Sequence, residues 1–180
     1  MTISFFEASA WKSKKRAIDD LEKYVKTFNL VDGATIDVPS VPILVVVRAY
    51  TKSFKESNIV LMKAIMQLFL ALFELHETLK KSPQLWICKD VVRVTVEKIS
   101  DRKFSQISPE LLTGLCVVRT PCTIIDLCLK KINVIKSPPT HEAFLKWCIS
   151  FCKDFGVGTI SACLNEFVKW IVKVCQFEHM

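Results

Sequence analysis

Hydrophobic residues recur every three or four positions along most of this 180-residue chain, which is the spacing of one face of an α-helix. The first such segment, Trp11–Phe28, carries an apolar stripe opposite a charged face. The same spacing predicts six further helices: Ser57–Leu79, Leu85–Ile99, Ser108–Val118, Pro121–Ile135, Thr140–Phe155 and Ile160–Phe177. The pattern is therefore that of an all-α protein.

Serine, proline and glycine mark the ends of several predicted helices. Ser108 and Pro109 form a start signal, with the serine expected as the N-cap and the proline at the first helical position. The next-to-last helix is expected to begin after Pro138 and Pro139 and to stop at Gly156. These signals leave only short turns between the helices.

Two apolar segments allow a second interpretation. Val41–Tyr50 is rich in β-branched residues and taken alone could be a buried strand, but its neighbours favour a helix. Ile59–Leu75 has seventeen residues with charges only near its ends, whereas a membrane span needs about 20. We therefore expect a helix buried on most of its faces and no transmembrane segment. The polar residues that follow Met1–Phe6 likewise predict no secretory signal.

The predicted helices come in pairs joined by short polar turns. These turns lie near Ser9–Trp11, Lys52–Glu56, Ser100–Phe104 and Ile135–Thr140. Their spacing of roughly 36 to 48 residues is close to that of a HEAT or armadillo unit, about 40 to 47 residues. We therefore expect a single domain over residues 1–180, a HEAT-repeat α-solenoid of about four and a half helix pairs. An irregular helical bundle is the alternative.

The net charge of +7 is concentrated in the same turns. The windows counted are residues 9–16, 52–57, 98–104 and 134–140. They hold ten Lys and Arg against two acidic residues, a sum of +8, which leaves −1 for the rest of the chain. Because successive turns of a solenoid stack along one edge, this edge would attract an acidic, elongated partner. Solvated lysine-rich loops without a partner would give the same count.

Tryptophan and cysteine add two further expectations. Trp11 lies in the first turn, where it could anchor an interface or pack against the next repeat. Trp86, Trp147 and Trp170 lie within apolar stripes and are expected in the core. The eight cysteines form no C-x-x-C pair and none precedes Cys88, which indicates reduced, mostly buried thiols and neither a disulfide framework nor a metal site.

Residues with catalytic chemistry are scattered along the chain. His76, His141 and His179 lie far apart, and the four glycines form no phosphate-binding loop, so neither an enzyme nor a cofactor is predicted. A nucleic-acid-binding helical repeat would share the basic edge but needs arginine or aromatic residues spread along it. A generic HEAT-type protein-interaction scaffold would differ only in its partner. Both stay as alternatives.

Four short motifs, in order and spacing, resemble a known family. They are Ala10–Leu21 with its Trp-Lys and basic cluster, Phe54–Leu61, Lys98–Lys103 with its Asp-x-Lys turn, and Phe144–Gly156. Together they resemble the TOG domains of the ch-TOG and Mini spindles family of microtubule polymerases, most of all a middle TOG domain. The resemblance covers most of Trp11–Phe177.

The resemblance implies a paddle of HEAT repeats whose turn edge binds the curved αβ-tubulin heterodimer and microtubule ends. Position by position, the implied tubulin-binding residues are Trp11, Lys12, Lys55, Asn58, Ile59, Arg102, Lys103 and Lys136. It further implies one module of a microtubule-associated protein that regulates microtubule dynamics and spindle organisation. The location is then the cytoplasm and its cytoskeleton, including spindle poles and centrosomes, with no nucleic-acid or membrane partner.

Two departures from the family pattern carry expectations of their own. Family domains usually have six repeats, and the match here ends in the fifth, so the domain is expected to be truncated there. The last helix would then expose an apolar face that invites self-association, formed by Phe167, Trp170, Ile171 and Val174. In the Asp-x-Lys turn, Ser100 stands where the family prefers glycine.

Overall fold

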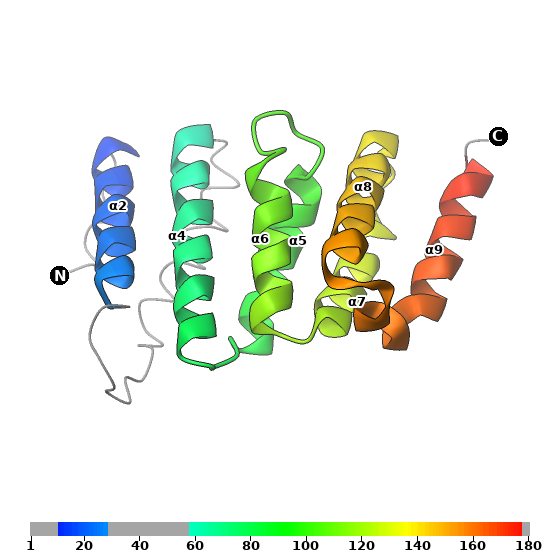
Figure 1. The fold of residues 1–180 in the computed structure, drawn as a ribbon. Helices are drawn as coiled ribbons and strands as arrows, with labels where there is room; N and C mark the ends of the chain where they lie inside the picture. Colours follow the sequence, from blue (N-terminus) through cyan, green and yellow to red (C-terminus); the bar gives the residue numbers. More distant parts are fainter. Residues whose placement is uncertain (1–10, 29–57, 178–180) are drawn as a thin grey trace. The chain divides into compact units, whose positions relative to one another are not determined.

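A computed structural model describes residues 11–28 and 58–177, and every regular element in that part of the chain is a helix (Figure 1). The elements are α2 (Trp11–Phe28), α4 (Ile59–Thr78), α5 (Leu85–Lys98), α6 (Ile107–Val118), α7 (Pro121–Ile132), α8 (Pro138–Phe155), the 3-10 helix η1 (Val157–Cys163) and α9 (Leu164–Phe177). The expected all-α class is confirmed. The helix expected over Val41–Tyr50 and the predicted site residue Lys55 lie outside the described residues.

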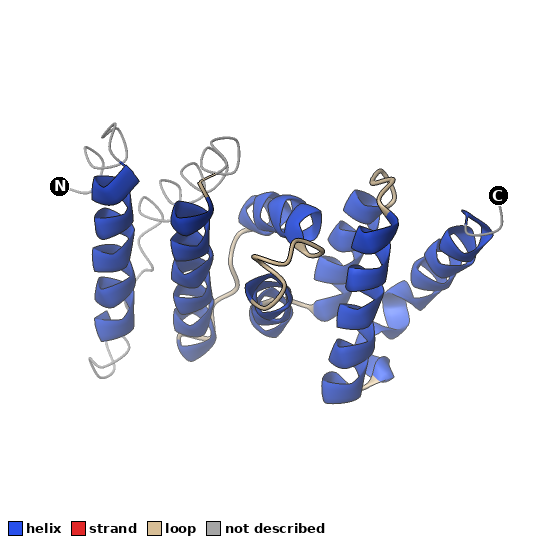
Figure 2. Ribbon diagram, turned by 90° about the horizontal axis from the view of Figure 1, so that it is seen from above, coloured by secondary structure: helices blue, strands red, loops and turns tan. Residues whose placement is uncertain are grey.

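The chain divides into two compact units, residues 1–90 and 91–180, with the boundary inside α5. In the first unit, α2 and α4 pack side by side, as Figures 1 and 2 both show, and the colours of Figure 1 show that they run in the same direction. The predicted apolar stripe of α2 is the face that it buries, through Ala17, Ile18, Leu21 and Val25. Ion pairs one turn apart, Lys15–Asp19 and Lys26–Glu22, line its charged side.

Helix α4 is the core helix of the first unit. Its length and composition would suit a membrane span, with a mean hydropathy of 1.7 over its most apolar 18 residues, yet 67% of that window is buried in the fold. Exposed polar residues recur on one narrow face, at Lys63, Gln67 and Glu74. Asn58 is the N-cap of the helix, and its side-chain oxygen accepts a hydrogen bond from the Leu61 N–H at 3.0 Å. Burial on most faces, as the sequence predicted, is confirmed.

Buried His76, in the last turn of α4, makes the stability of the first unit depend on pH. Its Nδ1 donates a hydrogen bond to the Lys81 carbonyl at 3.1 Å, and burial lowers the pKa of its imidazole below the usual 6.5. Between that lowered pKa and 6.5 the unfolded chain binds more protons, so the free energy of unfolding falls as pH drops below about 6.5. Urea midpoints at pH 7.5 and 5.5 should show this fall, and His76→Gln should reduce it. Equal pH dependence in both chains would contradict the assignment.

An aromatic cluster forms the core of the second unit. Phe144, Trp147 and Phe151 line the buried face of α8, at the helical spacing of three and four. Trp170 of α9 meets Phe144 edge-on, with ring centroids 5.2 Å apart. The Trp147 indole N–H donates to Thr113 Oγ1 of α6 at 3.0 Å, which satisfies its buried donor. The cluster thereby connects three helices.

Of the three tryptophans expected in a core, Trp147 and Trp170 are buried as predicted, whereas Trp86 is not. Trp86 lies in the first turn of α5 and is 37% exposed, with its indole N–H donating to Gln84 Oε1. The apolar stripe of α5 is carried by Ile87 and Cys88 at this end of the helix, and both are buried. The prediction for Trp86 was wrong because the stripe begins one residue later.

The start signal assigned to Ser108 and Pro109 was also wrong. Helix α6 begins at Ile107, so Ser108 lies inside its first turn, fully buried, and its Oγ has no partner among the described residues. Buried Phe104 draws the chain into the helical path early, since the Ser108 N–H already donates to the Phe104 carbonyl at 2.9 Å. Pro109 is tolerated there because the first N–H groups of a helix have no intrahelical acceptor.

Two further helices begin at positions other than the predicted ones. Helix α8 begins at Pro138, so both Pro138 and Pro139 lie within its first turn and do not precede it. It ends at Gly156, whose φ of +82° confirms the predicted stop. The helix predicted over Ile160–Phe177 is divided, with η1 first and α9 from Leu164 onward.

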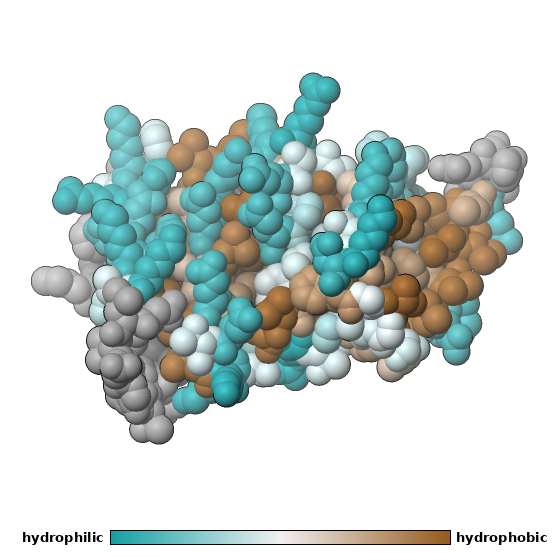
Figure 3. Space-filling view, viewed as in Figure 1, coloured by the Kyte–Doolittle hydropathy of each residue, from teal (hydrophilic) through white to brown (hydrophobic). Residues whose placement is uncertain are grey.

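The apolar face that α9 exposes differs from the predicted one. Trp170 is buried, and Phe167, Ile171 and Val174 are half-buried. The exposed apolar positions are Leu164, Val168 and Val172, one turn apart along the helix. Figure 3 shows this apolar surface over α9. Trp170 turns inward because Phe144 and Phe167 offer it aromatic contacts.

Candidate functional site

In the first unit, Trp11 is the first residue of α2 and is 44% exposed. The ammonium of Lys12 lies 6.0 Å from the centroid of its indole ring, within the range of a cation–π contact. Of the two placements that the sequence allowed, the structure has Trp11 on the surface. It presents an aromatic face beside a positive charge.

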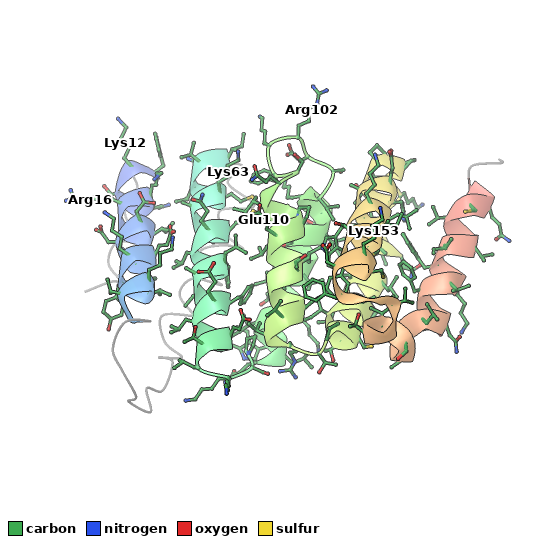
Figure 4. The ribbon with its side chains drawn as sticks, in the orientation of Figure 1. Lys12, Arg16, Lys63, Arg102, Glu110 and Lys153 are labelled. Atoms are coloured by element: carbon green, nitrogen blue, oxygen red, sulfur yellow. The ribbon has the colours of Figure 1, made fainter. Side chains whose placement is uncertain are left out.

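Exposed basic residues surround this end of the first unit. Lys12 and Arg16 lie one turn apart on α2, and Lys63 lies in the second turn of the parallel helix α4 (Figure 4). We call Trp11, Lys12, Arg16 and Lys63 the first basic surface, within which Figure 4 shows Arg16 on the side of α2 that faces away from α4. Arg16 and Lys63 were not among the predicted contacts, although each follows a predicted residue, Lys12 and Ile59, by four positions on the same helix.

The two other predicted residues of this unit have structural roles. Asn58 caps α4 with its side chain, and Ile59 is half-buried at the first helical position. Their side chains therefore shape the start of α4 and project less than Lys12 or Lys63 do.

In the second unit, the loop between α5 and α6 is built to display Arg102 and Lys103. Ile99 and Phe104 at its base are both buried. Between them, the Phe104 N–H donates to the Asp101 carbonyl at 2.8 Å, and the Lys103 N–H donates to Asp101 Oδ1 at 2.9 Å. The turn therefore projects the two basic side chains outward, and Figure 4 shows Arg102 at its tip.

A chain of hydroxyl groups joins this loop to the turn between α7 and α8. Thr140 Oγ1 donates to Ser137 Oγ at 3.0 Å, and Ser100 Oγ lies 3.0 Å from Thr140 Oγ1. Since the Thr140 proton is already used, Ser100 is the donor in the second bond. Ser100 thus connects two loops through a residue 40 positions away in the sequence.

The turn so connected carries Lys136, which is exposed. His141 Nε2 donates to the Ile135 carbonyl at 2.8 Å and fixes the path of the chain before Lys136. We call Arg102, Lys103 and Lys136 the second basic surface. The structure therefore places the predicted third and fourth turns next to each other, within one unit.

The second unit also gathers six thiols that the sequence analysis treated only as core residues. They come from α6, α7, α8 and η1: Cys116, Cys122, Cys128, Cys148, Cys152 and Cys163. Burial raises the pKa of Cys116, Cys128 and Cys148 above the usual thiol range, so these three stay protonated. Within the described ranges 11–28 and 58–177, no three of these thiols or of the His, Asp and Glu side chains are placed so that they could hold one metal ion. All eight cysteines are free, and the expectation that most are buried is confirmed.

The fold and these surfaces define an all-α protein that presents exposed basic residues in each of two compact units, on helices in the first and on loops in the second. Comparison with known proteins adds no closer assignment: no protein-family model, no curated protein and no solved structure matches the chain.

Proposed function

We propose that this protein binds αβ-tubulin through its two basic surfaces, as a TOG-type HEAT-repeat module of a microtubule-associated protein. The observation that carries the proposal is the loop between α5 and α6, where a buried phenylalanine and an Asx turn hold Arg102 and Lys103 away from the body. A loop anchored in this way needs less ordering when it binds a partner than a loop without such contacts does.

The chemistry of the surfaces suits an acidic protein partner. Tubulin is strongly acidic, and clusters of Lys and Arg would steer it and set its register. Trp11 beside Lys12 has the features of an interface anchor, because a large exposed aromatic side chain loses much surface to water on binding. The resemblance of the four sequence motifs to TOG domains supplies the identity of the partner.

Reversing the charge of the second basic surface is expected to weaken tubulin binding by about tenfold or more, since like charges would then face an acidic partner. The variant is Arg102→Glu with Lys103→Glu. A matched control with the same change in net charge is Lys153→Glu with Lys169→Glu, two exposed lysines of α8 and α9. Affinity is measured by sedimentation with soluble αβ-tubulin at low salt.

Three outcomes decide the proposal. Loss in the loop variant with binding retained in the control supports a specific surface. Equal loss in both variants would reduce the interaction to non-specific charge attraction, and no binding by the parent chain at about 50 µM would remove tubulin as the partner. A Trp11→Glu variant tests the first basic surface by the same assay.

A further inference from the structure

Two of the six clustered thiols meet across the contact between α7 and η1. Cys122, the second residue of α7, donates from its Sγ to the Thr159 carbonyl at 3.2 Å. Cys163, the last residue of η1, donates from its Sγ to the Ile160 carbonyl at 3.3 Å. Because these acceptors belong to consecutive residues of η1, the two sulfurs share one short stretch of backbone. The Cys122 thiol also lies close enough to Cys163 to raise the pKa of the Cys163 thiol.

The two thiols differ in their access to solvent. Cys122 is half-exposed, whereas Cys163 is buried. Burial, followed by the contact with Cys122, raises the pKa of Cys163 to about 12, so Cys163 is held as a thiol near neutral pH. A small oxidant in solution therefore reaches the Cys122 sulfur before the Cys163 sulfur.

We propose that Cys122 and Cys163 form a reversible disulfide when the protein meets a small hydroperoxide such as hydrogen peroxide. The inference rests on the contact of the two thiols and is independent of tubulin binding.

The chemistry balances with one peroxide for two thiols. The Cys122 sulfur attacks a peroxide oxygen, the O–O bond breaks, Cys122 becomes a sulfenic acid, and the second oxygen leaves as water. The Cys163 sulfur then displaces the hydroxyl group from Cys122. The S–O bond breaks, the S–S bond forms, and the Cys163 proton leaves with the hydroxyl group as a second water. A thiol reductant reverses the product by thiol–disulfide exchange.

Cys116, Cys128 and Cys148 also lie near one another in the second unit, but all three are buried, so none of them is as open to an oxidant as Cys122. Cys148 and Cys152 lie one turn apart on α8, so a bond between them would connect nothing beyond that helix. Cys175 is exposed on α9, where only intermolecular bonding is open to it. A bond from Cys122 to Cys163 would instead tie the start of α7 to the residue just before α9.

The test uses the full reduced chain, dilute and treated with hydrogen peroxide, followed by peptide mapping without reductant. We expect the eight free thiols to fall by two and a linked pair of peptides that contain Cys122 and Cys163. The linked chain should also unfold on the order of 10 °C higher, because the bond closes a loop of about 40 residues. Reductant should reverse both changes.

Serine variants make the assignment specific. Cys122→Ser should abolish the link, and because this site is half-exposed the fold should survive, as circular dichroism can verify. Cys163→Ser should leave a sulfenic acid at Cys122 that a cyclic diketone reagent traps. Cys152→Ser, at another half-buried thiol, is the control and should form the link as the parent does. A different pairing, oxidation of Cys122 without a link in the parent, no oxidation at all, or a link that persists in Cys122→Ser would overturn the proposal.

Discussion

Replacing Phe144 with alanine is expected to lower the free energy of unfolding of the second unit by about 4 kcal/mol, within the usual range for a buried phenylalanine. Phe144 is fully buried, and its ring lies 5.5 Å from that of Trp147 and 5.2 Å from that of Trp170. The substitution removes the ring between two tryptophans on different helices. The cavity cannot close without moving α9 toward α8, so the full cost should appear.

Urea unfolding followed by tryptophan fluorescence measures this loss directly, because Trp147 and Trp170 report on the same cluster. The matched control is Phe155→Ala on the same helix, where the ring stacks on Phe151 but is 43% exposed. Its cost should be about 1 kcal/mol or less. Similar losses at the two positions would show that the cluster is not the core of the unit.

The second large effect is expected in α4, where Met66→Lys should unfold the first unit or destabilise it by more than about 3 kcal/mol. Met66 is fully buried, and a lysine there would place a charge in the core without a partner. The adjacent Gln67→Lys inserts the same side chain on the exposed face and should change stability by less than about 0.5 kcal/mol. Thermal unfolding followed by circular dichroism compares the two variants.

This pair of substitutions also distinguishes an apolar helix packed in a folded unit from one surrounded by lipid. A helix packed in a folded unit tolerates charge on its polar stripe and not one position away. A helix surrounded by lipid would be damaged at both positions. If Met66→Lys and Gln67→Lys lower the stability equally, the face of α4 that carries Gln67 is also buried, against lipid or against a partner.

Hydrophobic periodicity predicted most of the described helices well, because a helix that buries one apolar stripe repeats its hydrophobic residues every three or four positions. Helix α2 was predicted to the residue, since its charged face and apolar face are cleanly divided. The errors lie where tertiary contacts compete with local signals. Burial of Phe104 places the start of α6 before Ser108, the residue that was predicted to cap it. In α9, aromatic contacts place Trp170 in the core, and a different apolar face of the helix is exposed.

The candidate site was only partly predictable for a related reason. Charge counts along the chain indicated Arg102, Lys103 and Lys136 as surface residues, and the structure places all three there. The bond between Ser100 and Thr140 and the contact of Cys122 with Cys163 each join residues about 40 positions apart. Neither contact has a local pattern, so only the packed helices reveal it.

The hydroxyl chain from Ser100 through Thr140 to Ser137 bears on the thermodynamics of recognition. Ordering a loop costs conformational entropy, and here that cost falls on folding, before any partner arrives. A partner then meets Arg102 and Lys103 in one arrangement and loses little further freedom from the loop. Removing one of these three hydroxyl groups would leave every charge of the second basic surface in place. We expect the variant to bind its partner more weakly, and the loss of affinity to appear as a less favourable entropy of association.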